Sequence, residues 1–118
     1  MSIDLKRAYD PAAASDGHRI LIDRIWPRGV TKEELKVDAW LKDLAPSTGL
    51  RKWFGHDPKK WDEFRKRYAG ELEQRSDALE QLAEIAKAGH VTLVFGAKDT
   101  LHNNAVALKE HLERRLKG

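Results

Sequence analysis

A short apolar run, Ile20-Leu21-Ile22, leads directly into a dense set of charged, aromatic and turn-forming residues, Asp23 to Gly29. An uninterrupted run of β-branched residues and leucine is typical of a strand that is buried on both faces. In open α/β sheets, ligands bind in the crevice beyond the carboxyl ends of the strands. The stretch therefore predicts a central strand over residues 18–23 and a binding site where that strand ends.

Further strands and helices are predicted on both sides of this run. Alternating apolar residues predict a strand with one solvated face over 2–8, and Val91 to Phe95 predict another buried strand. Residues 37–44 are predicted to be a short helical or irregular segment. Capping residues predict the starts of helices at Thr31, Ser47, Asp57, Ser76 and Thr100.

This order of elements predicts the α/β class, with a small, mainly parallel sheet of three strands or slightly more and about five helices. A length of 118 residues predicts one domain, 1–118. The chain has no cysteine, which excludes disulfides and zinc thiolate sites. Its histidines lack metal-ligand spacing, so we expect neither a metal site nor a cofactor. No apolar run or signal peptide is evident, so we expect a cytoplasmic protein without a membrane partner.

The charges around the first predicted site favour an anionic ligand. Between Arg24 and Lys60 the chain has nine Lys or Arg residues and five Asp or Glu residues. Arg24 and Arg28 are four residues apart, and two guanidinium groups at a strand end can hold one phosphate or carboxylate. Trp26 is predicted to line the same site. The alternative is that Arg24 pairs with Asp23 while Trp26 only covers the core.

A second candidate segment, residues 96–104, follows the strand that ends at Phe95. We expect it at the same sheet edge as the first, with amides that open a helix facing the crevice. Lys98, Asn103 and Asn104 are candidate ligand-binding residues, and Asp23, Asp99 and His102 are candidates for acid–base catalysis at a phosphate or related group. The alternative is that Asp99 or Thr100 only caps the helix.

The competing prediction is an interaction module for nucleic acid or protein. It depends on the basic residues of the segment 51–67, although a solvated surface is the more common origin of such a run. His56 beside Asp57 resembles an acid–base pair, but Asp57 is better explained as the cap before Pro58. The basic residues of this segment are Arg51, Lys52, Lys59, Lys60, Arg65, Lys66 and Arg67.

The chain resembles the YeaO-type family, a bacterial domain family of unknown function. The matching motifs are L-I-D-R-I-W-P-R-G-V at 21–30, W-L-K-D-L-A-P-S-T at 40–48, L-R-K-W-F-G-H-D-P at 50–58 and H-N-N-A at 102–105. The resemblance implies an α/β fold and covers nearly the whole chain. It implies no activity, substrate or cofactor. The predicted ligand, an anionic small molecule such as a phosphorylated compound or a nucleotide, therefore depends on the residues alone.

Overall fold

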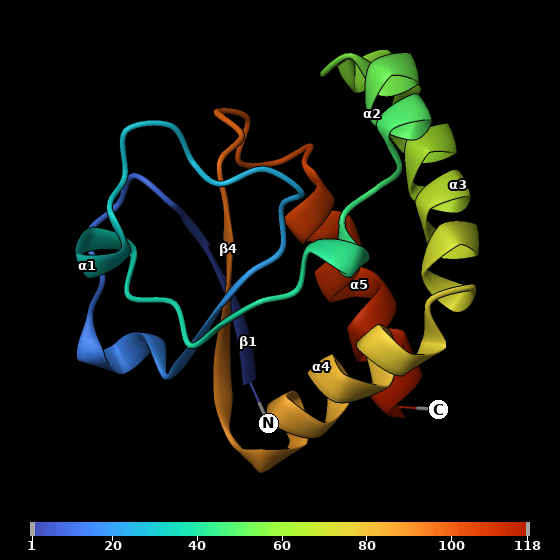
Figure 1. Cartoon of the computed structure of the whole chain (residues 1–118). Helices are drawn as coiled ribbons and strands as arrows, with labels where there is room; N and C mark the ends of the chain where they lie inside the picture. The colour runs from blue at the N-terminus through green and yellow to red at the C-terminus, as the bar shows by residue number, and fades with distance from the viewer. Residues whose placement is uncertain (1, 118) are drawn as a thin grey trace.

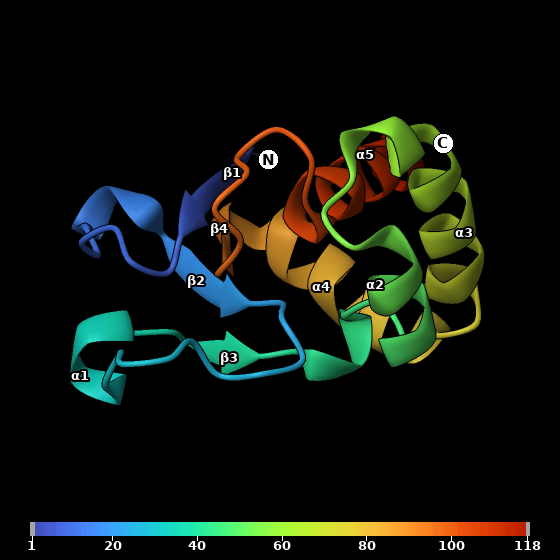
Figure 2. The same ribbon diagram turned by 90° about the horizontal axis from the view of Figure 1, so that it is seen from above.

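Four parallel strands form the sheet, in the spatial order β1-β4-β2-β3 (Figures 1 and 2). The structure is a computed structural model that describes residues 2–117. The α/β class and the mainly parallel sheet predicted from the sequence are confirmed, with one strand more than the minimum of three. The strands are β1 (Ser2–Arg7), β2 (His18–Leu21), β3 (Ala39–Trp40) and β4 (His90–Phe95).

The strand order explains how a short link can join β1 to β2. Parallel neighbours need a crossover of about a dozen residues or more, and only residues 8–17 separate these two strands. In the structure they are not neighbours, because β4 lies between them and pairs with both. Ile3 is opposite Val91 in one pairing, and Ile20 is opposite Leu93 in the other.

The sheet separates a thick layer of helices from a thin one. Alternate residues of a strand point to opposite faces. Ile20 and Leu93 thus pack into the main core under the helices, whereas Leu21 and Val94 pack with Leu35 on the other face. Figure 2 shows α1 (Lys32–Leu35) on the side opposite the remaining helices. Those are α2 (Thr48–Phe54), α3 (Trp61–Glu73), α4 (Ser76–Ala88) and α5 (Asn104–Lys117).

The predicted helix caps are confirmed at Thr31 and Ser47. Thr31 forms a capping box with Glu34 ahead of α1, and the Ser47 hydroxyl accepts the Leu50 N–H. The Asp57 side chain also caps, but it caps the 3-10 turn η3 (Pro58–Lys60) that precedes α3. Local side-chain to backbone bonds of this kind depend on sequence spacing alone, which explains why the sequence predicts them.

Two predicted elements differ from the structure. Residues 37–44 contain the two-residue strand β3 and the 3-10 turn η2 (Lys42–Leu44), and two residues are too few to show strand alternation. The last helix begins at Asn104 and not after Thr100, because the Asn103 side chain accepts the Val106 N–H and caps it. Leu101 lies in the preceding turn and is exposed.

Tyr68 on α3 connects the helical layer to η2. Its hydroxyl donates to the Leu44 carbonyl at 2.5 Å, and both residues are buried. Burial, assisted by the charges of Asp23 and Glu71, raises the pKa of Tyr68 far above its usual value. The unfolded chain can thus ionise this phenol in a pH range where the folded chain cannot.

We expect Tyr68→Phe to reduce the free energy of unfolding at pH 7 by about 1–3 kcal/mol, because the buried Leu44 carbonyl loses its donor. A raised folded-state pKa gives stability that is present below the unfolded pKa of about 10 and lost above it. Urea unfolding at pH 7 and pH 11 should therefore show a smaller difference between variant and wild type at pH 11. An equal difference at both pH values would contradict this account.

Candidate functional site

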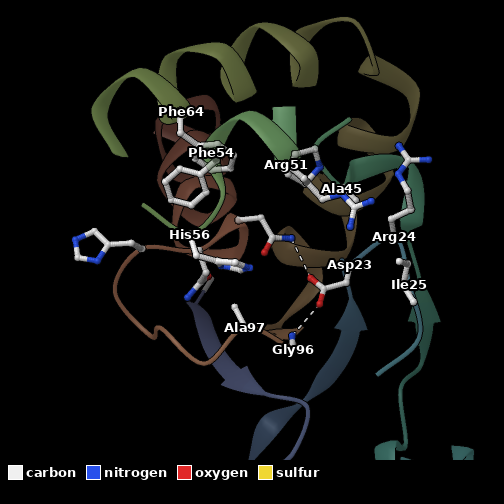
Figure 3. A pocket seen from close by; sticks show the side chains of 14 residues that line it. Asp23, Arg24, Ile25, Ala45, Arg51, Phe54, His56, Phe64, Gly96 and Ala97 are labelled. Atoms are coloured by element: carbon white, nitrogen blue, oxygen red, sulfur yellow. Dashed lines mark hydrogen bonds between the residues drawn. The ribbon is translucent and has the colours of Figure 1, made fainter. Parts of the chain in front are cut away.

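A cavity of about 330 Å³ opens at the carboxyl ends of β2 and β4, between the loops that follow these strands and helices α2 and α5 (Figure 3). The sequence predicted that the two loops meet at this edge, and they do. The cavity has a polar side and an apolar side. Its lining residues are Asp23, Arg24, Ile25, Ala45, Pro46, Arg51, Phe54, His56, Phe64, Gly96, Ala97, His102, Asn103 and Asn104.

Asp23 joins the two loops to α5. Its Oδ2 accepts the Gly96 N–H at 2.8 Å, and its Oδ1 accepts the Asn104 side-chain amide at 3.0 Å. A Cβ on residue 96 would lie 3.2 Å from Asp23 Oδ2, so glycine permits this close approach. The Trp40 indole donates to the Asp23 carbonyl at 2.7 Å and fixes the backbone from the other side of the sheet.

Burial raises the pKa of Asp23 above its ordinary value. The hydrogen bonds from Asn104 and Gly96 and the positive charge of Arg51 oppose this effect without cancelling it. Desolvation penalises the charged form of a carboxyl group, so any further negative charge brought beside Asp23 would raise its pKa more. The protonation state of Asp23 is therefore sensitive to the contents of the cavity.

Arg24 is half-buried beside Asp23, in the bend that follows β2. Its Nε atom is buried and has no hydrogen-bond partner among the described residues. Arg24 lines this cavity and also a second one, of about 450 Å³, at the start of α4. The alternative that Arg24 pairs with Asp23 finds no support, since neither oxygen of Asp23 receives a bond from it in residues 2–117.

Arg51 reaches the cavity from α2 and is the main residue that the sequence assigned elsewhere. It shares a helix face with Leu50 and Phe54, which are both buried, and so it points inward. Its Nε atom is likewise buried without a hydrogen-bond partner in the described chain. The sequence placed Arg51 on the basic surface of 51–67. Its spacing from Leu50 and Phe54 was the signal that could have located it.

His102 is held by Asp99 at the cavity wall. Its Nδ1 lies 3.0 Å from Asp99 Oδ2, and its ring packs edge-on against Trp61. Asp99 also accepts the backbone N–H groups of Leu101 and His102, and these bonds hold its pKa below the ordinary value. The arrangement orients the imidazole. Of the three catalytic candidates, Asp23 and His102 line the cavity, and Asp99 contacts it only through His102.

Asn103 and Asn104 place the first turn of α5 at the cavity. Asn103 is buried, where it caps the helix and donates to the Asp99 carbonyl at 2.8 Å. Asn104 binds Asp23. The amino-terminal end of a helix carries a partial positive charge and free N–H groups. These two side chains thus have structural roles, and the helix end that they position adds positive potential to the cavity.

The rim at His56 has an uncommon backbone conformation. Gly55 and His56 both have positive φ, 54° and 57°, directly after α2. A left-handed conformation is costly for a non-glycine residue, and such outliers cluster at functional sites. His56 is exposed and its side chain lines the cavity, whereas Asp57 is engaged in capping η3.

Three other predicted ligand-binding residues are placed outside this lining. The Trp26 indole donates to the Val30 carbonyl at 2.6 Å and packs edge-on against Trp40, with the core of the opposite sheet face. Arg28 and Lys98 are exposed. Their roles in binding stay predictions, and the proposal below does not depend on them.

Two of the seven basic residues in the segment 51–67 are paired with carboxylates, and a third is bound to a backbone carbonyl. Arg65 pairs with Asp62 and Glu110, and Arg67 pairs with Glu63. The Lys60 ammonium group donates to the Trp53 carbonyl. These contacts, together with the inward position of Arg51, leave less free positive charge on this surface than the sequence suggests. They weaken the case for a nucleic-acid interface.

Within residues 2–117, no group of three or more His, Cys, Asp or Glu side chains is arranged to hold a metal ion. In the same residues, every helix is too short or too polar to cross a membrane.

Comparisons with known proteins place the chain in a family. A family model described as "Inactive DUF488-N3 subclade" matches residues 2–118. The uncharacterized protein YeaO of Escherichia coli is 46% identical over 112 residues, which cover 95% of this chain and 97% of YeaO. The uncharacterized protein Rv3073c of Mycobacterium tuberculosis is 38% identical over 113 residues, which cover 96% of this chain and 95% of that protein. No solved structure matches the chain significantly. The chain therefore belongs to the YeaO-like family of domains of unknown function, in the subclade that the matching model describes.

Proposed function

We propose that the protein binds an anionic small molecule in the cavity at the carboxyl ends of β2 and β4, through Arg24 and Arg51. The observation that carries the proposal is that both side chains line one cavity and that neither guanidinium group forms an ion pair within the described residues. A guanidinium group binds phosphate or carboxylate through two parallel hydrogen bonds. An anion in the cavity would supply the charged partner that both side chains lack.

The surroundings of the two arginines support an anion further. The first turn of α5 adds positive potential, and His56 and His102 add imidazole donors. A volume of about 330 Å³ is at the lower end of the usual range for small-molecule sites. The cavity is therefore suited to a small metabolite.

Binding is favoured over catalysis. The Asp99–His102 pair is suited to proton transfer at a phosphate group, but Asp99 also has a structural role as the acceptor of two backbone N–H groups. The matching family model describes the subclade as inactive, which agrees with a binding role. The proposal thus assigns the two arginines to ligand binding and assigns no reaction to the cavity.

A thermal-shift screen tests the proposal with phosphate, sulfate, nucleotides and sugar phosphates as probes. We expect at least one probe to raise the Tm, since a ligand at about a hundredfold over its Kd adds about 2.7 kcal/mol. The shift should be lost in Arg24→Ala and kept in Arg114→Ala. Arg114 is the matched control because it is an exposed arginine on α5 that does not line the cavity. The assignment would be contradicted if both variants lost the shift, or if no probe raised the Tm of the wild-type protein.

A further inference from the structure

The carboxylate of Asp23 has unused acceptor capacity inside the cavity. An ionised carboxylate has about four lone-pair positions. In the described residues, the Gly96 N–H and the Asn104 amide occupy one position on each oxygen. Asp23 lines the same cavity as Arg24 and Arg51, and Figure 3 shows its carboxylate below the two guanidinium groups. The cavity therefore offers a fixed acceptor as well as two strong donors.

This combination is a poor match for a bare inorganic anion. An anion small enough to fill only the space between the arginines would bring a second negative charge close to a carboxylate that is already penalised by burial. A ligand that carries a hydroxyl or amino group as well as its anionic group offsets that repulsion with a hydrogen bond to the carboxylate. It would donate to Asp23 and accept from the arginines at the same time.

Part of the cavity wall is apolar and aromatic. Phe54 and Phe64 are buried, stack with ring centroids 4.3 Å apart, and both line the cavity. Ala45 lines the cavity beside the two arginines (Figure 3). Such a wall is suited to a flat ring and offers little to a compact, fully hydroxylated sugar.

We infer that the ligand is a nucleoside monophosphate, with its phosphate at Arg24 and Arg51, a hydroxyl or amino group at Asp23, and its base against the Phe54 side. The inference rests on the proposed function and names the ligand class of that same cavity. It follows from the presence of two donors, one acceptor and an aromatic wall in a single cavity of metabolite size. Asp23 is thus the residue that distinguishes a nucleotide from a simple anion.

The test compares dissociation constants measured by calorimetry on the wild-type protein. The probes are the four ribonucleoside 5′-monophosphates, the corresponding nucleosides, ribose 5-phosphate and inorganic phosphate. We expect at least one monophosphate to bind at least tenfold more tightly than its nucleoside, ribose 5-phosphate and inorganic phosphate. Analogues of that monophosphate that lack one hydroxyl or amino group should include one that binds at least tenfold more weakly, because the Asp23 acceptor is then left without its donor.

The variant Asp23→Asn should change the two probe types in opposite directions. Affinity for inorganic phosphate should rise, because a negative charge is removed, while affinity for the preferred monophosphate should fall. Asp62→Asn on α3, which removes an exposed carboxylate outside the cavity, should leave both constants unchanged. The Tm of Asp23→Asn without ligand shows whether the loops remain joined. If the variant does not fold, the analogue series on the wild-type protein tests whether Asp23 accepts a hydrogen bond from the ligand.

The possible failures are distinguishable. If inorganic phosphate or ribose 5-phosphate binds as tightly as every monophosphate, the ligand class is wrong but the anion site stands. If nucleosides bind as tightly as their monophosphates, the arginines do not hold the phosphate, and the proposed function is wrong as well. If no phosphorylated probe binds, both proposals are overturned.

Discussion

Replacing Arg51 by alanine is expected to weaken binding of the anionic ligand by about tenfold to a hundredfold, which removes most of the ligand-induced rise in Tm. A hydrogen bond to a charged group is worth about 1.5–3 kcal/mol, and each 1.4 kcal/mol is a factor of ten in affinity. Arg51 has no competing partner for its Nε–H in residues 2–117, so its loss is not offset by a released carboxylate. The Tm of the variant without ligand should change little.

The matched control is Lys52→Ala. Lys52 is the next residue on α2, is basic and exposed, and does not line the cavity. The Lys52→Ala variant should keep the ligand-induced rise in Tm of the wild-type protein. An NMR titration of the Asp23 carboxyl gives an independent readout. Arg51 lowers the pKa of Asp23, so the pKa should rise further in Arg51→Ala and stay unchanged in Lys52→Ala. Equal ligand responses in the two variants would mean that Arg51 does not contact the ligand.

Replacing Asp16 by alanine is expected to have the largest effect on stability, about 3–5 kcal/mol. Asp16, in the 3-10 turn η1 (Ala14–Asp16), accepts from Arg19 at 2.7 Å, and both residues are buried. Arg19 also donates to the Leu35 carbonyl of α1, and its second terminal nitrogen is buried without a partner among residues 2–117. Removing the carboxylate leaves a buried guanidinium group uncompensated.

Chemical unfolding of Asp16→Ala and Asp62→Ala measures this difference. Asp62 also pairs with an arginine, Arg65, but its side chain is 83% exposed. Exposed pairs contribute about 1 kcal/mol or less, so the control should stay within that range. A loss below 1 kcal/mol for Asp16→Ala would show that the buried pair does not stabilise the α1 side of the sheet.

The pH dependence of stability has a defined sign at Asp16. Burial would raise its pKa, but hydrogen bonds from the Ala13 N–H, Lys6 and Arg19 outweigh that effect and hold the pKa below 3.8. A lowered folded-state pKa gives stability that is present above the unfolded pKa and lost as the pH falls through the folded one. As the pH falls below about 4, the free energy of unfolding should therefore decrease less in Asp16→Asn than in the wild-type protein.

Features that depend on neighbours along the chain could be predicted from the residues alone. The apolar runs at 20–22 and 91–95 specify buried strands, and Thr31 and Ser47 specify helix starts, because strand burial and capping follow from residue type and spacing. The same local logic predicted that Asp23, Arg24, His102, Asn103 and Asn104 follow strand ends. Parallel strands bring such residues to one sheet edge, and they line one cavity.

Which distant residues complete the site depends on how the elements pack together. The spacing of Arg51 from Leu50 and Phe54 indicates an inward position on α2, but it does not specify that this part of the helix borders the strand ends of β2 and β4. Trp26 lies with Trp40 because β3, only two residues long, pairs beside β2. Strand order, helix docking and the side of the sheet that a loop covers all depend on contacts between segments far apart in the chain. Residue spacing carries little information about such contacts.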